Sequence, residues 1–419
     1  AFGTQDYYPD MHTGRISVDD EAELTTYVNK VLDYCTDPDT STDWFNRVLL
    51  AAAEEFGRYF VWGSETVYDY LNPLGYDIDR QYQGGTPPGS TTGCIAAIDN
   101  GVTWANHRDH GISQNSGASY TGWSSPRFTT DHIANDINNG EMWPMMVSLN
   151  CESGWFDGET DTYPSRNYES IGEVAIRVPD GFIAAMAHTR VSYSGYNDEI
   201  GRGNFDAQFP GFDPAYPFTG GTNPYTTDVH RVSQIMNYAK FWMYDKYVAP
   251  GGCAPYPWTP NEQVSETTFE MLHVHGDPTV EIWWAMPADL NVNHPIQAMY
   301  GQSLFEITVK DQSNSPVEGA LVCLMQPNGL YAKGVTDATG VAELDIMVVE
   351  PDEITITVTA HNFLPYSTQI MVGSSFPPDP PVLQGPSNGR PNKEYSFSAQ
   401  TTDPEGSQIL YLFQWGDGT

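Results

Sequence analysis

Three polar side chains follow three separate apolar runs of the sequence. Glu54 comes directly after the run 48–53, His110 follows the run 101–105, and Cys151 lies two residues after the run 145–149. Short apolar runs of this kind are typical of buried strands in a parallel sheet. Because the carboxyl ends of such strands meet at one edge, we expect these three side chains to converge there.

A cysteine and a histidine at that edge are the minimum for covalent thiol catalysis. The thiolate is the nucleophile, the imidazole moves the proton, and a carboxylate such as Glu54 orients the imidazole. Gly111 lets the backbone approach a substrate and donate an N–H to an oxyanion, together with the N–H of Cys151. The alternative is a buried structural cysteine, since free cysteine is among the most buried residue types.

The composition narrows the class of protein. The 419 residues include 18 Lys+Arg against 54 Asp+Glu, a formal net charge of −36. Such a surface disfavours nucleic acid and anionic membranes as partners, and suits calcium or cationic partners. No apolar run reaches the roughly 18 residues of a membrane span. Low lysine content and abundant tyrosine and tryptophan favour an extracellular or cell-surface setting.

The five cysteines lie at positions 35, 94, 151, 253 and 323, and they form no CxxC pair. This spacing does not predict a zinc ribbon. The count is odd, so at least one cysteine is unpaired, and the four besides Cys151 allow zero, one or two disulfides. The chain opens at Ala1 without a signal peptide, which indicates a processed product of a longer precursor.

The pattern of elements predicts an α/β domain followed by all-β modules. Strands and helices alternate over 1–288, which favours a mainly parallel sheet covered on both faces. Within this part we expect a long loop over 191–224, an amphipathic helix over 227–247 and a closing strand over 279–284. Short alternating strands at 303–310, 318–325, 342–349, 353–360 and 366–372 predict a β-sandwich of immunoglobulin size over 289–373. Residues 374–419 combine a Pro-rich linker with the truncated start of a second β module.

Five segments together carry a family resemblance: DYYPDMHTGRI, WFNRVLLAAAE, the His110-Gly111 loop, SLNCESGWF and HGDPTVEIW. In this order and spacing they resemble the catalytic domain of the gingipain family of cysteine peptidases (family C25, caspase-like clan), over roughly residues 5–287. The resemblance implies an α/β caspase-like fold, then an immunoglobulin-like domain. The tail resembles the start of a PKD-type domain. The family's first subdomain is missing here, so we expect a sheet that is incomplete or completed by a cleaved N-terminal fragment of the same precursor.

The resemblance also implies roles for individual residues. His110 is the general acid/base, Cys151 the nucleophile, and Gly111 and Cys151 form the oxyanion hole. Glu54 matches the orienting residue, with Glu55 as its nearest competitor. Relatives that prefer a basic P1 residue (the residue before the scissile bond) use a carboxylate in the S1 pocket that receives its side chain. Here Tyr193 matches a pocket wall and Asp198 is the candidate acid, so a basic P1 preference is open.

Several parts of the sequence combine residues that could bind a metal ion. Asp157, Glu159 and Asp161 alternate in a loop after the cysteine, and oxygen-rich acidic loops suit calcium, which the resemblance implies as a stabilising ion. The alternative is an ordinary solvated loop. Histidines near acids (His107 and His110 around Asp109; His273 and His275 with Asp277) show no complete zinc ligand set, so we expect no metal or other cofactor in catalysis.

The sequence therefore predicts a secreted or cell-surface cysteine endopeptidase that acts on peptide substrates. A rival from another class is a non-catalytic extracellular structural or adhesive protein that keeps the peptidase fold. A third interpretation is another cysteine hydrolase or transpeptidase that uses the same site with a different acyl acceptor.

Overall fold

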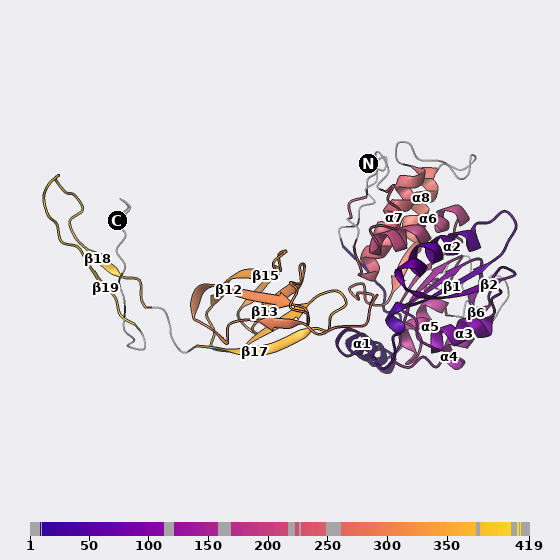
Figure 1. The fold of residues 1–419 in the computed structure, drawn as a ribbon, viewed down its shortest axis with the longest axis horizontal. Helices are drawn as coiled ribbons and strands as arrows, with labels where there is room; N and C mark the ends of the chain where they lie inside the picture. The colour runs from indigo at the N-terminus through magenta and orange to yellow at the C-terminus, as the bar shows by residue number, and fades with distance from the viewer. Residues whose placement is uncertain are drawn as a thin grey trace. The chain divides into compact units, whose positions relative to one another are not determined.

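The computed structural model describes residues 9, 11–112, 121–157, 169–216, 223–225, 228–248, 261–373, 378–403, 409 and 411. The chain divides into two compact units, Ala1–Pro287 and Ala288–Thr419 (Figure 1). Among the described residues, none of the helices is long and apolar enough to cross a bilayer.

The first unit is built on a six-stranded sheet of order β2-β1-β3-β7-β8-β9. Its strands are β1 (Arg47–Ala53), β2 (Asp77–Gln83), β3 (Trp104–Arg108), β7 (Met145–Leu149), β8 (Ala184–His188) and β9 (Leu272–His275). The first five in this order run parallel, and β9 is antiparallel to β8. Strands β3, β7 and β8 are buried along their whole length. Burial on both faces explains the mainly apolar composition of β7 and β8, whereas β3 also contains buried polar residues.

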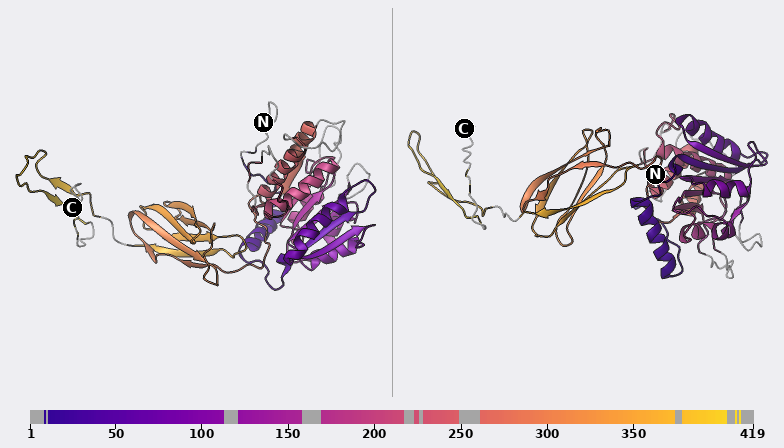
Figure 2. Two further views of the ribbon diagram at one scale, coloured as in Figure 1. Left: turned by 45° about the horizontal axis from the view of Figure 1, so that its top comes forward. Right: turned by 60° about the horizontal axis from the view of Figure 1, so that its bottom comes forward.

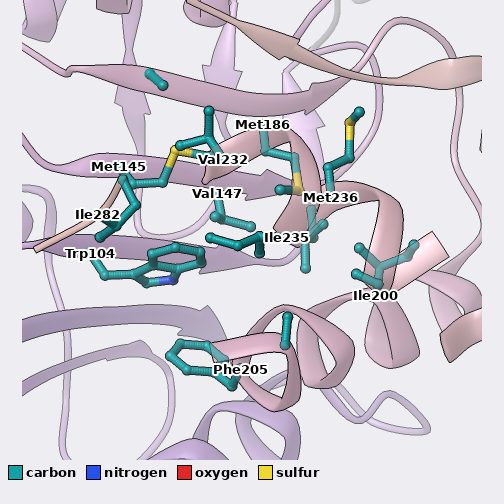
Figure 3. Close-up of a cluster of buried hydrophobic side chains, with 14 of the residues drawn as sticks. Trp104, Met145, Val147, Met186, Ile200, Phe205, Val232, Ile235, Met236 and Ile282 are labelled. Atoms are coloured by element: carbon teal, nitrogen blue, oxygen red, sulfur yellow. The ribbon is translucent and has the colours of Figure 1, made fainter. Parts of the chain in front are cut away.

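Helices cover both faces of this sheet (Figure 1). One face carries α2 (Phe60–Leu71), α6 (Ser194–Gln208), α7 (Val232–Tyr247) and α8 (Asn261–Met271), and the other carries α3 (Thr91–Asp99), α4 (Thr130–Asn135) and α5 (Ile171–Arg177). Helix α1 (Glu21–Thr36) packs beside α5. Alternate residues of β7 enter the two cores: Met145 and Val147 meet the helices on one face, as Figure 3 shows, while Met146 enters the other core.

Short elements complete the first unit. The 3₁₀ helices Trp44–Asn46 and Asn72–Leu74 flank β1 and α2. A small antiparallel sheet beside the main one contains β4 (Gly111–Ile112), β5 (Gly122–Trp123) and β6 (Phe128–Thr129). Strand β4 of this small sheet begins directly after His110.

The second unit contains a β-sandwich. One sheet has β10 (Asn291–Asn293), β12 (Gly301–Lys310) and β15 (Val341–Val348); the other has β11 (Gln297–Ala298), β17 (Tyr366–Val372), β16 (Ile354–Thr359), β13 (Leu321–Met325) and β14 (Tyr331–Val335). Buried residues alternate with mostly exposed ones along β15 and with partly buried ones along β16, as expected when one face of each sheet meets the core. Figure 2 shows the two layers of strands. A further pair, β18 (Val382–Gln384) and β19 (Ser398–Gln400), lies beyond the sandwich.

The α/β class with a following all-β region is confirmed, and the helix expected over 227–247 is observed as α7. The side chain of Asp20 caps α1, and Ser90 caps α3 by accepting the N–H of Gly93. Two predictions were wrong. The expected loop 191–224 contains the fifteen-residue helix α6. The expected closing strand 279–284 is irregular apart from one bridge at Glu281, and the edge strand is β9.

Candidate active site

The candidate residues follow strands whose ends lie level with one another. Ala52 of β1 is opposite Arg108 of β3, and Arg108 is opposite Leu149 of β7. His110 lies two residues beyond Arg108, and Cys151 two residues beyond Leu149. The parallel register therefore brings both segments to one edge of the sheet, as the strand pattern predicts.

The carboxylate that meets His110 belongs to Glu55 rather than Glu54. Nε2 of His110 lies 2.9 Å from Oε2 of Glu55, and both side chains are about half exposed. Glu54 continues the β1 pairing through its N–H, which donates to Gln83. Successive side chains along an extended strand point in opposite directions, so only one of the two glutamates can face the histidine. The contact expected of Glu54 is made by its neighbour.

Charged and aromatic groups hold this pair in place. The ring of Phe60, at the start of α2, meets the imidazole of His110 edge-on at 5.7 Å. The hydrogen bond with His110 and the nearby Arg58, 3.5 Å away, hold the pKa of Glu55 below its usual range. Glu55 therefore stays a carboxylate at neutral pH and can orient the imidazole of His110.

Asp109 adds a second carboxyl group beside the histidine. It is buried, and burial raises its pKa to about 6. Ligand atoms of Glu55, Asp109 and His110 lie within 4.8 Å of one another, the one such grouping among the described residues. Within those residues, neither His107 nor the His273–His275 segment joins a group of this kind.

The sulfur of Cys151 lies against the loop that follows β8. Its Sγ accepts the N–H of Ser192 at 3.4 Å, and the Ser192 hydroxyl lies 3.8 Å away. Ser192 in turn accepts a hydrogen bond from the side chain of Asn197 at 2.7 Å. The thiol is half-buried and takes part in no disulfide, and the same holds for Cys35 and Cys323, while Cys94 is free and fully buried. Cys253 lies outside the described residues.

Gly111 touches the backbone of the segment that contains Cys151. A Cβ on Gly111 would lie 1.9 Å from the carbonyl oxygen of Cys151 and 3.0 Å from the side-chain oxygen of Asn150. Only glycine allows this close approach, which joins the residue after His110 directly to Cys151. The oxyanion role of the two N–H groups stays a prediction.

A buried hydrogen-bond network next to Cys151 was not predicted from the sequence. Nδ1 of His107 accepts the side-chain N–H of Asn150 at 2.8 Å, and Nε2 lies 3.2 Å from the carbonyl of Ser125. The His107 ring stacks on Trp123 at 4.5 Å. Complete burial lowers the pKa of His107 to about 3, so a neutral imidazole holds the residue that precedes Cys151. The partners of His107 are 18 and 43 residues away in sequence, so no local pattern reveals them.

The candidate S1 acid has a partner from within the chain. The carboxylate of Asp198 lies 2.7 Å from Nε of Arg108, and both side chains are at least 90% buried. Tyr193, the candidate pocket wall, is 39% exposed and meets Tyr196 edge-on. Asp198 is therefore not the unpaired acid that a basic P1 side chain would need, and Arg108 is a site residue that the sequence analysis missed.

The acidic loop after the cysteine is only partly described. Both oxygens of Asp157 accept hydrogen bonds from Arg190, at 2.8 and 2.6 Å, and these bonds hold the pKa of Asp157 below its usual range. Glu159 and Asp161 lie outside the described residues. The calcium site stays a prediction, and the one described member already has a cationic partner.

The fold, together with a cysteine, a histidine and a carboxylate at one edge of its sheet, is that of an α/β thiol enzyme. The sequence profile described as peptidase family C25 matches residues 2–283, and the chain belongs to this family of cysteine peptidases. The expected family membership is thereby confirmed for the first unit.

The chain is also similar to individual members of the gingipain group. Lys-gingipain HG66 of Porphyromonas gingivalis is 27% identical over 395 residues, which cover 90% of this chain and 20% of the relative. Gingipain R2 of P. gingivalis (strain ATCC BAA-308 / W83) is 21% identical, covering 85% and 43%. The chain thus spans less than half the length of these relatives. The crystal structure of the Arg-specific cysteine proteinase gingipain R shares the fold, with a TM-score of 0.69, 19% identity and coverage of 88% of this chain and 77% of that one.

Proposed function

We propose that this chain is a cysteine endopeptidase in which Cys151 is the nucleophile, His110 the general acid/base and Glu55 the orienting carboxylate. The observation that carries the proposal is the 2.9 Å contact between His110 and Glu55, next to a glycine that touches the carbonyl of Cys151. If Nε2 of His110 donates to Glu55, the other ring nitrogen, Nδ1, is free to accept the thiol proton.

The reaction then follows from these groups. The thiolate of Cys151 attacks the carbonyl carbon of the scissile bond, and the N–H groups of Gly111 and Cys151 stabilise the oxyanion. The protonated imidazole of His110 gives its proton to the leaving amine, and the C–N bond breaks. His110 next takes a proton from water, whose oxygen attacks the thioester, and the acid product leaves as the thiol is restored.

An extracellular or cell-surface location fits the same chain. The formal charge of −36 suits a protein that works in solution rather than on nucleic acid or an anionic bilayer. The sandwich of the second unit, an immunoglobulin-like domain in this proposal, and a PKD-type module from residue 374 would serve as spacers. Calcium as a structural ion belongs to the same proposal.

Active-site labelling tests the proposal. Acyloxymethyl-ketone probes with different P1 residues should label the wild-type chain in reductant and calcium, and Cys151→Ala should abolish labelling. Cys323→Ala is the matched control, because Cys323 is also half-buried and free of disulfides but lies in the second unit. Absence of labelling and of peptide hydrolysis in the wild type would favour the non-catalytic surface protein instead.

A transpeptidase would pass the same labelling test. The two enzymes differ in the group that resolves the acyl-enzyme: water in the peptidase, an amine in the transpeptidase. Mass spectrometry of the products of a peptide substrate, with an excess of an added glycine peptide as acceptor, separates them. We expect free carboxyl products, and a dominant ligated product would contradict hydrolysis.

A further inference from the structure

Arg108 forms an ion pair with Asp198, and the other nitrogens of its guanidinium group also have hydrogen-bond partners. Nε donates to Asp198, Nη1 donates to the carbonyl of Leu149 at 3.1 Å, and Nη2 lies 2.6 Å from the carbonyl and 2.9 Å from the hydroxyl of Ser194. The guanidinium also lies over the ring of Phe60, 4.3 Å from its centroid. A buried charge held by so many partners is fixed in position.

This pair belongs to the segments that carry the reacting groups. Arg108 is two residues before His110. Asp198 lies near the N-terminal end of α6. Ser192, in the loop directly before α6, donates its N–H to the sulfur of Cys151. Ser192 and Asn197 are hydrogen-bonded to each other, so the loop and the first turn of α6 form one unit beside the nucleophile.

Very little space is left around the pair. The cavity bordered by Arg108, Asp198, Leu149 and Phe205 has a volume of about 20 Å³. A space of this size holds about one water molecule. While Arg108 stays in place, this cavity has no room for the long side chain of a lysine or arginine beside Asp198.

We propose that Arg108 determines the P1 specificity of this enzyme by occupying, with its own guanidinium, the place at Asp198 that a basic P1 side chain would take. The enzyme therefore cleaves after uncharged residues and disfavours lysine and arginine. This inference rests on the proposed endopeptidase function. A basic P1 side chain at Asp198 would displace Arg108 and leave a buried guanidinium without its counter-ion, which is strongly unfavourable. An acidic P1 side chain would also be disfavoured, because the N–H groups of Arg108 already donate to other partners. It would in addition be repelled by the carboxylate of Asp198.

The test compares labelling rates of acyloxymethyl-ketone probes that differ only in P1: Ala, Leu, Gln, Asp, Lys and Arg. On the wild type, the best uncharged probe should label Cys151 at least about tenfold faster than the Lys and Arg probes, since loss of a charge pair discriminates more strongly than a change of one methylene group. In Arg108→Ser, which leaves Asp198 unpaired, labelling by the Lys probe should rise at least about tenfold relative to the Ala probe.

Two control variants isolate the cause. Arg108→Ser combined with Asp198→Asn should show no rise with the Lys probe, because the acid is gone. Arg231→Ser removes an arginine paired with Glu281 at 3.0 Å elsewhere in the unit, and its P1 preference should equal that of the wild type. Circular dichroism shows whether each variant folds, and the wild-type preference needs no variant at all.

The possible failures are distinguishable. Wild-type labelling that is fastest with the Lys or Arg probe, and lost in Cys151→Ala, would overturn this inference and leave the endopeptidase in place. No labelling by any of the six probes would overturn the proposed function and the inference with it.

Discussion

At the scale of single residues, Glu54 and Glu55 show what can and cannot be predicted from the positions of strand ends in the sequence. The pattern of apolar runs places Cys151 and His110 at one edge of the sheet, because it needs only the strand order and the parallel direction. It does not decide which of two adjacent glutamates faces the histidine, since a shift of one residue reverses the side-chain direction. The structure resolves this choice through the contact between His110 and Glu55.

Replacing the two glutamates one at a time tests this assignment. Glu55→Gln keeps the shape but removes the charge next to the imidazole, so the rate of probe labelling should fall by about 10- to 100-fold, as for other residues that orient a catalytic or ligating histidine. Glu54→Gln is the matched control and should stay within about twofold of the wild type. Equal losses in both variants would remove the special role of Glu55.

Arg108 and His107 mark the limit of prediction from sequence. Both lie inside β3. Because they are polar, the strand predicted from the apolar run ends three residues early, at 105 instead of Arg108. Each is buried only because distant groups satisfy it: Asp198 and Ser194 for Arg108, Asn150 and Ser125 for His107. Hydrogen bonds across 18 to 90 positions leave no local signal in a single sequence.

At the scale of elements, α6 is the instructive error. Its sequence, SGYNDEIGRGNFDAQ, contains three glycines and several turn-forming residues, so local propensity favours a loop. The helix forms because it packs closely on α7. A Cβ on Gly203 would lie 2.8 Å from the Cβ of Trp242 and 2.9 Å from the backbone at Ala239. Here the glycine that weakens the isolated helix is what permits the contact.

Alanine substitutions of two helical glycines should therefore change stability in opposite directions. Gly203→Ala should destabilise the first unit by about 1–3 kcal/mol, because the added methyl group forces α6 and α7 apart. Gly63→Ala, in α2, is the matched control: its Cβ would meet nothing within 4 Å, so it should stabilise by about 0.5–1 kcal/mol through helix propensity. Urea unfolding followed by circular dichroism measures both. A stabilising Gly203→Ala would show that the helices do not pack as tightly as described.

At the scale of the whole molecule, alternation of elements was enough to predict the class of the first unit and the all-β character of the second. The closing strand was misplaced for a physical reason. Val280, Ile282 and Trp284 have the alternating apolar pattern of a strand, but they are buried by packing into the helical core, where Trp284 stacks on Trp104. The true edge strand, β9, contains the buried His275 and the partly buried His273, whose polarity concealed it.

Buried histidines also give the molecule a predictable sensitivity to acid. Burial lowers the pKa of His107, His188 and His275 from 6.5 to about 3. A group whose pKa is lower in the folded state stabilises the fold at high pH, and this contribution is lost as pH falls through the unfolded value of 6.5. Asp109 and Asp206, whose pKa burial raises to about 6, act in the opposite sense below that pH. The window that reports on the histidines is therefore about pH 6 to 7.5.

Across that window the three histidines should lower the free energy of unfolding by about 2 kcal/mol between pH 7.5 and pH 6. Two buried lysines, Lys30 and Lys240, have a pKa lowered to about 7 by burial and change stability in the same direction. His188→Leu isolates one histidine, because neither of its ring nitrogens has a hydrogen-bond partner among the described residues. Urea unfolding of both proteins at pH 7.5, 6.75 and 6 should show a drop smaller by about 0.7 kcal/mol in the variant. An identical drop in the two proteins would mean that His188 becomes protonated in the folded state, and that its side chain is reached by water.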